Sequence, residues 1–140
     1  YNLFSMALID LEKFAMKELQ YQKYPEDHYL FKPFACKDCG VTPLSLTIEH
    51  HSGSANVEFR GKIFGTCSQC TQTSEVFSFT GEHRQAEKNT FPICECGSKF
   101  FITGQGERFS SDDEIPGFAE EGVVVTTCQQ CGKTTKILEY

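Results

Sequence analysis

The chain has 140 residues, of which 39% are hydrophobic and 13% aromatic, with eight cysteines and no tryptophan. This length suits one ordinary domain or two very small ones, and very small units expose too much surface to be stabilised by core burial alone. The formal net charge of −6 disfavours nucleic-acid binding, which depends largely on Lys and Arg contacts to phosphate, so we expect a protein partner instead.

Neither a membrane segment nor an export signal is recognisable. The longest apolar runs, such as Val123-Val124-Val125, are far shorter than a membrane-spanning helix requires. The N-terminal segment mixes charged residues such as Asp10 and Lys13 into its apolar pattern, unlike a signal peptide. We therefore expect a cytoplasmic protein that does not associate with membranes. In that reducing compartment, paired cysteines hold metal more often than they form disulfides.

An amphipathic helix is predicted from about Met6 to Tyr24, ending before Pro25. Side chains that recur every three or four residues form a mostly apolar stripe on it: Leu8, Leu11, Phe14, Ala15, Leu19 and Gln22. We expect this stripe to pack on the first of two cysteine-containing units. The alternative is that it docks a partner protein. Residues 1–30 are thus interpreted as an N-terminal helix and arm.

The next segment, residues 31–80, is predicted to contain three strands. Residues 44–49 alternate between apolar and polar side chains, as in a half-buried strand. A turn at 51–54 follows, residues 57–64 return to a second cysteine pair, and residues 75–79 form the third strand. Residues 81–90 are polar and without periodicity, so they are interpreted as a connector.

Residues 91–140 repeat this plan. Strand-like sequence at 99–103 leaves one cysteine pair, residues 122–127 return to another, and residues 134–138 close the chain. The sequence therefore predicts a mostly β fold. Two tandem three-stranded antiparallel modules are preceded by an amphipathic helix.

The first cysteine group has the spacing of a four-sulfur metal site. Cys36 and Cys39 form one C-x2-C pair, and Cys67 and Cys70 form another. Such a turn brings two sulfur atoms to the separation that a tetrahedral ion requires, and two turns on neighbouring strand ends complete the shell. Gly40, directly after the first pair, permits a left-handed backbone there. A four-sulfur shell selects zinc or iron rather than hard cations.

The second group combines Cys94-x-Cys96 with Cys128-x2-Cys131. Its first pair is one residue shorter than the usual spacing, which tightens the turn. A glycine again follows the later cysteine of each pair. Pairing across the two units, with cysteines of one unit completing the site of the other, is an alternative that requires the connector to fold back.

The segments Cys36-Lys37-Asp38-Cys39-Gly40 and Cys128-Gln129-Gln130-Cys131-Gly132 resemble the knuckles of the zinc-ribbon superfamily, as does the order of pair, strands and pair. The resemblance implies structural zinc closing each module. It implies eight ligands in two sets: Cys36, Cys39, Cys67 and Cys70, then Cys94, Cys96, Cys128 and Cys131. It is nearly silent on activity, because zinc ribbons occur in proteins of many functions.

We expect a non-catalytic protein with two structural Zn²⁺ ions per chain and a role in protein interaction or assembly. Closed four-sulfur sites leave no open position for water or substrate, and no catalytic motif such as H-E-x-x-H is present. Three alternatives remain. They are four disulfides in an exported protein, rubredoxin-like iron for electron transfer, and a transcription-associated zinc ribbon that binds nucleic acid or a polymerase.

Two further features of the sequence are interpreted as solvated loops. His50 and His51 fall near turn residues, so we expect them at a hairpin tip rather than as metal ligands. Acidic side chains crowd between two strands of the second module, at Glu107, Asp112, Asp113, Glu114, Glu120 and Glu121. Their placement is similar to the acidic hairpin of transcript-cleavage factors, but a solvated acidic loop is the expectation.

Overall fold

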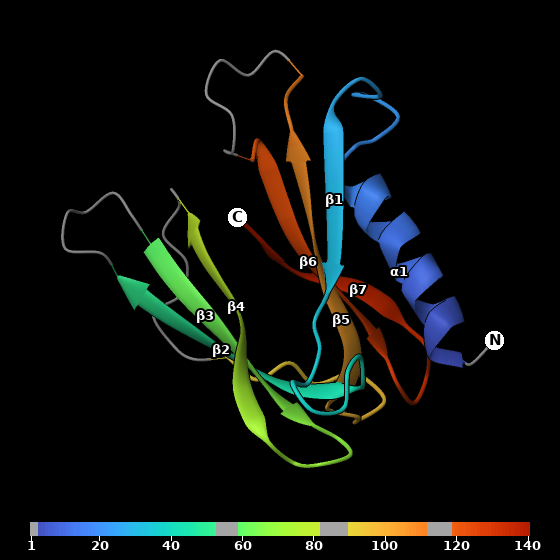
Figure 1. The fold of residues 1–140 in the computed structure, drawn as a ribbon, viewed down its shortest axis with the longest axis vertical. Coiled ribbons are helices and arrows are strands. Elements are labelled where there is room, and N and C mark those ends of the chain that lie inside the picture. Colours follow the sequence, from blue (N-terminus) through green and yellow to red (C-terminus); the bar gives the residue numbers. More distant parts are fainter. Residues whose placement is uncertain (1–2, 53–58, 82–89, 112–118) are drawn as a thin grey trace.

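The computed structural model describes residues 3–52, 59–81, 90–111 and 119–140 (Figure 1). The helix and strands, in chain order, are α1 (Leu3–Glu18), β1 (His28–Pro33), β2 (Leu44–Ser52), β3 (Phe59–Cys67), β4 (Thr73–Gly81), β5 (Phe100–Phe109), β6 (Glu121–Cys128) and β7 (Thr134–Glu139). The mostly β fold with an N-terminal helix is confirmed. Within the described residues, no helix is both long enough and apolar enough to cross a membrane.

The strands form one antiparallel sheet in the order β4-β3-β2-β5-β6-β7, with β1 pairing β5 beside this path. Strands β2–β4 form one meander, here called the first unit, and β5–β7 form another, the second unit. The two units are joined by a short ladder in which Leu44 pairs with Phe101 and Ser45 with Phe100. The predicted connector at 81–90 lies outside the described residues except for its two ends, and the division into separate domains stays a prediction.

The same irregularity recurs in both units. The register between β3 and β4 shifts at Ile63/Phe64, and the register between β6 and β7 shifts at Val124/Val125. These bulges stand at the same distance before Cys67 and Cys128. Each leaves one residue of the edge strand without a partner, and both of these residues, Val76 and Ile137, pack against the same apolar core.

An aromatic ring covers a glycine at matching places in the two units. A Cβ atom at Gly61 would lie 2.1 Å from a ring carbon of Phe79, and one at Gly122 would lie 2.2 Å from the ring of Tyr140. Glycine leaves room for the ring, which in turn shields backbone that has no side chain of its own. Together with the bulges, these pairs make the two units structural repeats.

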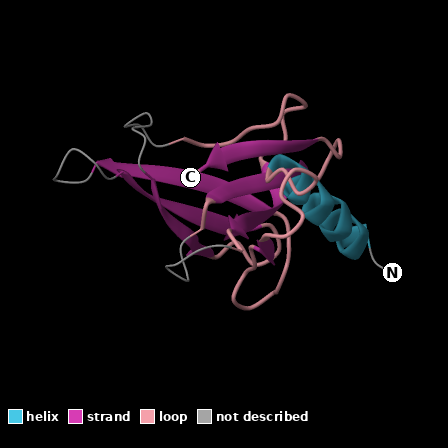
Figure 2. Ribbon diagram, turned by 90° about the horizontal axis from the view of Figure 1, so that it is seen from above, coloured by secondary structure: helices cyan, strands magenta, loops and turns pink. Residues whose placement is uncertain are grey.

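Apolar cores lie on both faces of the second unit. One core lies between the two units and contains Leu46, Ile63 and Val124. The other lies beneath α1 and contains Val123 and Val125. Strand β6 is therefore buried on both sides, which explains its uninterrupted run of valines. The strands of the two units diverge away from the β2–β5 ladder in Figure 1, and Figure 2 shows α1 on one side of the strands.

The helix packs on the second unit, so the expectation that it packs on the first is wrong. Leu11, Ala15 and Leu19 are completely buried against β5 and β6. Gly106 of β5 allows this approach, since a Cβ atom there would lie 3.2 Å from the Cβ of Ala15. The apolar centre of the predicted stripe is therefore covered by the second unit, whereas Gln22 lies beyond the helix end and is exposed.

The helix ends at Glu18 rather than at Tyr24, and Pro25 does not end it. Gln20 adopts a left-handed conformation with φ 61°. Its amide donates to the carbonyl of Lys17 at 3.1 Å, while the amide of Tyr21 donates to the carbonyl of Met16 at 3.1 Å. This is a Schellman cap, usually made by glycine, so glutamine gave no signal of it in the sequence.

Strand β1 was not predicted, and it extends from the end of the segment interpreted as an arm into the segment assigned to the first module. It pairs with β5 from His28 opposite Phe109 to Pro33 opposite Gly104. Its side chains alternate between the two faces, and Tyr29 and Phe31 pack against the core beneath α1. The boundary predicted between residues 30 and 31 thus lies inside a strand.

A largely buried arginine ties the turn before β1 to β5 and β6. The side chain of Arg108 is 12% exposed, and its Nη1 lies 2.8 Å from Oδ2 of Asp27, while Nη2 lies 3.5 Å from Oε2 of Glu121. The guanidinium also stacks over the ring of Tyr24 at 4.1 Å from the centroid. Its hydrogen bond holds the pKa of Asp27 below the usual value of a carboxyl group.

We expect Arg108→Met to lower the free energy of unfolding by about 2 kcal/mol, because it leaves two poorly solvated carboxylates without their cation. Lys62→Met is the matched control. Lys62 pairs with Glu75 at 3.7 Å, but both side chains are about half exposed, and such pairs contribute less than about 1 kcal/mol. Urea unfolding of metal-saturated protein measures both variants. Equal losses in the two would contradict this account of Arg108.

Candidate metal centres

The structure brings the first predicted group of cysteines together. One pair lies in the segment before β2, and the other lies at the turn between β3 and β4. The Sγ atoms of Cys36, Cys39, Cys67 and Cys70 all lie within 4.8 Å of one another, and those of Cys36 and Cys70 are 3.5 Å apart. Four thiolates around one ion at about 2.3 Å form a tetrahedron with edges of about 3.8 Å. The group therefore has the dimensions to hold one metal ion.

The second predicted group assembles in the same way at the corresponding end of the second unit. The sulfur of Cys94 lies 3.4 Å from that of Cys131, and the sulfur of Cys96 lies 3.5 Å from that of Cys128. All four lie within 4.8 Å of one another, so this group could hold a second ion. Each group draws its cysteines from one unit, and cross-pairing between units is not observed.

The first knuckle of each site is a tight turn closed by backbone hydrogen bonds. In the first unit the amide of Cys36 donates to the carbonyl of Gly40 at 2.8 Å, and the amide of Gly40 donates back at 3.0 Å. In the second unit the amide of Gly97 donates to the carbonyl of Cys94 at 2.8 Å, one residue sooner. Both glycines have positive φ, 79° and 94°, which explains their predicted role.

The second knuckles are nearly identical in the two units. The amide of Cys67 donates to the carbonyl of Gln72 at 2.9 Å, and the amide of Cys128 donates to the carbonyl of Lys133 at 2.9 Å. A further backbone hydrogen bond of 3.1 Å links each second knuckle to the segment that follows the first knuckle. The amide of Ser68 donates to the carbonyl of Pro43 in the first unit, and the amide of Gln129 donates to the carbonyl of Phe100 in the second. The backbone therefore holds both knuckles of a site in place.

One position distinguishes the two second knuckles. Thr71 stands where the second unit has Gly132, and it adopts the same left-handed conformation, with φ 62° against 77°. That conformation costs an L-residue roughly 1–2 kcal/mol, and a β-branched side chain is especially unfavourable there.

We expect Thr71→Gly to raise the free energy of unfolding by about 0.5–1 kcal/mol, since the relief of strain exceeds the entropy cost of glycine. Gly132→Thr is the matched reverse change and should lower it. Urea unfolding of metal-saturated protein measures both. A loss of stability in Thr71→Gly would mean that its hydroxyl bond to the Cys70 carbonyl, at 2.6 Å, outweighs the strain.

One thiol in each site is poised to ionise. The backbone amide of Cys70, the hydroxyl of Thr42 and the amide of Gln69 lower the pKa of Cys67 to about 6. Burial raises the pKa of Cys128, but the amides of Cys131 and Gln130 more than offset this and lower it to about 6. Hydrogen bonds to the thiolate favour the ionised form. A thiolate is the form that binds metal.

A second thiol in each site, Cys39 and Cys96, shows why such a cluster suits a cation. Hydrogen bonding with Cys70, together with burial, raises the pKa of Cys39 to about 12. The amide of Ser98 lowers the pKa of Cys96, but burial and the neighbouring thiols raise it to about 11. Four thiolates this close repel one another, so the cluster ionises fully only with a cation among them.

Thr42 supports the first site and was missed by sequence reasoning. Its side chain is 2% exposed, and its Oγ1 lies 3.3 Å from the Sγ of Cys67. A hydrogen bond of this kind to a metal-binding sulfur fixes the orientation of the sulfur and changes its affinity for the metal. The second unit has Lys99 at the matching place, so the motif alone carried no signal for it.

The two sites differ in their exposure to solvent. In the first site Cys36 and Cys67 are buried and Cys39 is exposed, whereas in the second only Cys128 is buried and both Cys96 and Cys131 are exposed. Among the described residues, these are the only groups of three or more His, Cys, Asp or Glu side chains close enough to share an ion.

The predicted loop positions of the two histidines and of part of the acidic segment are wrong. His50 and His51 do not lie at a hairpin tip but within β2, opposite Gly61 and Arg60. Glu107 and Glu121 were assigned to the acidic loop but lie in β5 and β6. Glu120 is exposed just before β6, and its amide donates to the carbonyl of Arg108 at 2.7 Å. The other three acidic residues, Asp112, Asp113 and Glu114, lie outside the described residues.

Comparison of the whole chain with protein-family models, with curated proteins and with solved structures finds no match.

Proposed function

We propose that the protein is a non-catalytic interaction module whose two units are each closed by one structural zinc ion. The observation that carries the proposal is the convergence of eight cysteines into two complete four-sulfur groups, each of which joins separate strand ends. Such a group fills all four positions of a tetrahedral ion with protein ligands.

Zinc is favoured by the ligand set and by the topology around it. Four thiolates select zinc or iron over magnesium or calcium. Each group pins together two turns of one small meander, so metal binding contributes directly to the folding of that meander. Small β units of this kind otherwise lack enough core for independent stability.

An interaction role is favoured over catalysis and over nucleic-acid binding. Saturated sites have no position for a substrate or an activated water. Adding eight thiolates (−8) and two divalent cations (+4) to the formal charge of −6 gives −10 for the loaded protein. Such a charge repels phosphate backbones and leaves protein as the favoured partner.

The metal content of protein purified without added metal, together with its visible absorption spectrum, tests this proposal. We expect two colourless zinc ions per chain. Red, iron-loaded protein would replace the proposal with electron transfer, and metal-free protein with disulfides would overturn it. Tight binding of DNA or RNA at low salt would favour the transcription-associated alternative.

A further inference from the structure

The helix α1 carries a second row of side chains beside its buried stripe, and Met16 of this row also packs against the core beneath α1. Met6, Ile9, Lys13 and Met16 follow one another at intervals of three and four residues, so they share one face of the helix, and Gln20 lies just beyond its end. Met6 and Ile9 are 57% and 50% exposed. This row, here called the outer stripe, is distinct from the buried stripe that packs on β5 and β6.

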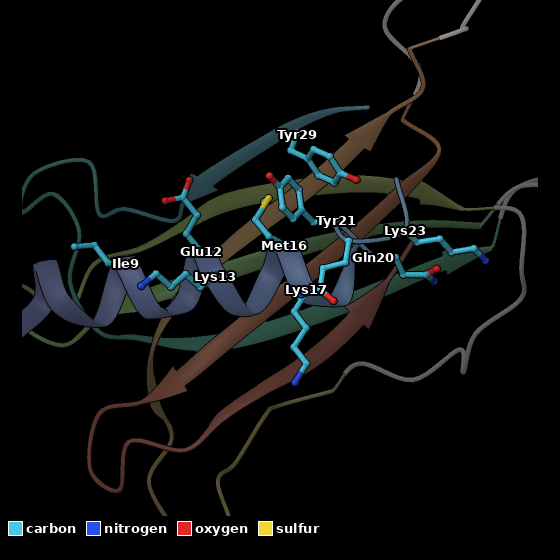
Figure 3. A pocket seen from close by; sticks show the side chains of 10 residues that line it. Ile9, Glu12, Lys13, Met16, Lys17, Gln20, Tyr21, Lys23 and Tyr29 are labelled. Carbon is cyan, nitrogen blue, oxygen red and sulfur yellow. The ribbon is translucent and has the colours of Figure 1, made fainter. Parts of the chain in front are cut away.

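A groove of about 700 Å³ runs along the outer stripe. Its walls come from α1, from the turn that follows the helix, and from β1, and they include Ile9, Met16, Tyr21 and Tyr29. Figure 3 shows Met16 and the two tyrosine rings gathered in one part of the groove. A side chain entering there would meet mainly apolar atoms.

The aromatic part of the groove is held in place from within the protein. The rings of Tyr21 and Tyr29 meet edge to face with their centroids 5.5 Å apart. The hydroxyl of Tyr29 donates to the carbonyl of Tyr24 at 2.6 Å. A site that is already ordered loses little entropy when a partner binds, which favours affinity.

The charge around the groove is opposite to that of the whole chain. Lys13, Lys17 and Lys23 line it with one acidic residue, Glu12, whereas the chain has a formal net charge of −6. In Figure 3 the side chains of Lys13, Lys17 and Lys23 extend outward from Met16 and the tyrosine rings in different directions. A bound segment with acidic residues beside its apolar row would place carboxylates near these amino groups.

We propose that this groove binds an amphipathic helix of a partner protein that carries acidic residues along the borders of its apolar face. The spacing of the outer stripe suits a helix that lies alongside α1 and inserts side chains at intervals of three and four residues. This inference deepens the proposed interaction role and rests on it, since it names the surface and the chemistry of the partner.

Two other occupants fit the groove less well. A second copy of the chain that packed the same stripe symmetrically would bring Lys13 and Lys17 close to their own counterparts, which is unfavourable. A nucleic acid would meet three lysines but also a mainly apolar wall and a strongly acidic protein. The acidic amphipathic helix satisfies both the apolar wall and the lysines.

Selection from a display library of amphipathic helical peptides, with flanking residues randomised among acidic, neutral and basic types, tests the proposal on the full metal-loaded chain. We expect the retained peptides to be acidic beside their apolar row. Ile9→Gln and Lys13→Glu should each weaken a retained peptide by about tenfold in fluorescence anisotropy, and Lys13→Glu with Lys17→Glu should shift selection toward basic peptides.

Matched controls lie on the opposite face of β1. Leu30→Gln and Lys32→Glu make the same changes at exposed residues outside the groove and should leave the affinity unchanged. Retained peptides that bind the groove variants as tightly as the parent would refute the groove but keep the interaction role. A library that yields no binder would contradict both.

The same variants decide between the other occupants. We would test binding of a single-stranded DNA 20-mer, of anionic lipid vesicles and, by sedimentation, of a second copy of the chain. If one of these binds and the binding is lost in Ile9→Gln and Lys13→Glu but not in the β1 controls, the groove would be assigned to that occupant. Any such result would overturn the proposed acidic helix.

Discussion

Cys67→Ser is expected to reduce the bound metal from two ions per chain to one and to unfold the first unit. Cys67 is 1% exposed and pairs with Leu44, so it belongs both to the metal group and to the core between the units. A four-thiolate site contributes about 10–16 kcal/mol of apparent binding energy to folding. This binding energy is as large as the whole free energy of unfolding of an ordinary domain, about 5–15 kcal/mol.

Elemental analysis gives the metal count, and amide hydrogen exchange shows which strands lose protection. We expect β3 and β4 to exchange rapidly while β5 and β6 remain protected. Ser68→Ala is the matched control, because it alters the neighbouring residue of the same knuckle and keeps the backbone bond from Ser68 to Pro43. A Cys67→Ser protein that retained two ions would refute the assigned ligand set.

The two units should differ in how strongly they depend on their ions. The second unit is covered by α1 and β1, whose side chains bury Ile102, Val123 and Val125 from the outer side. Among the residues that the structure describes, the first unit contacts an apolar core on one face, through residues such as Leu46 and Ile63. Loss of an ion from the first unit therefore removes a larger share of what holds it together.

The metal groups could be predicted because their chemistry is local. A C-x2-C turn places two sulfurs together whatever the surrounding fold, and Gly40 and Gly132 have the positive φ expected of the residue after a knuckle. The strand at 44–49 could be predicted because one of its faces is buried and the other is not. In both cases a few neighbouring residues contain the whole signal.

The arrangement of the units depended on contacts between distant segments. β1 pairs with β5 across more than half the chain, and its own residues show only a short alternation. The helix packs on the second unit, where Gly106 lies beneath Ala15 and leaves room for the helix to approach. Neither segment alone indicates this contact. The helix end at Glu18 was missed for a different reason, since the left-handed conformation that caps the helix is adopted by Gln20, a residue type that rarely adopts it.

Leu11→Ala is expected to lower the free energy of unfolding by about 3 kcal/mol, whereas Ile9→Ala should lower it by less than about 1 kcal/mol. Leu11 is completely buried against the second unit, and its loss leaves a cavity between α1 and the sheet. Ile9 is half exposed on the outer stripe and already contacts solvent. Urea unfolding of metal-saturated protein, with metal content checked in each variant, measures both changes.

The comparison separates two roles of one short helix. A charged residue at Leu11 or Leu19 would report on folding, because both side chains lie in the core. A change at Ile9 leaves that core intact, so a loss of peptide binding there would report on docking. Equal destabilisation by Leu11→Ala and Ile9→Ala would mean that the outer stripe is also covered within the protein, and the groove could then not receive a partner.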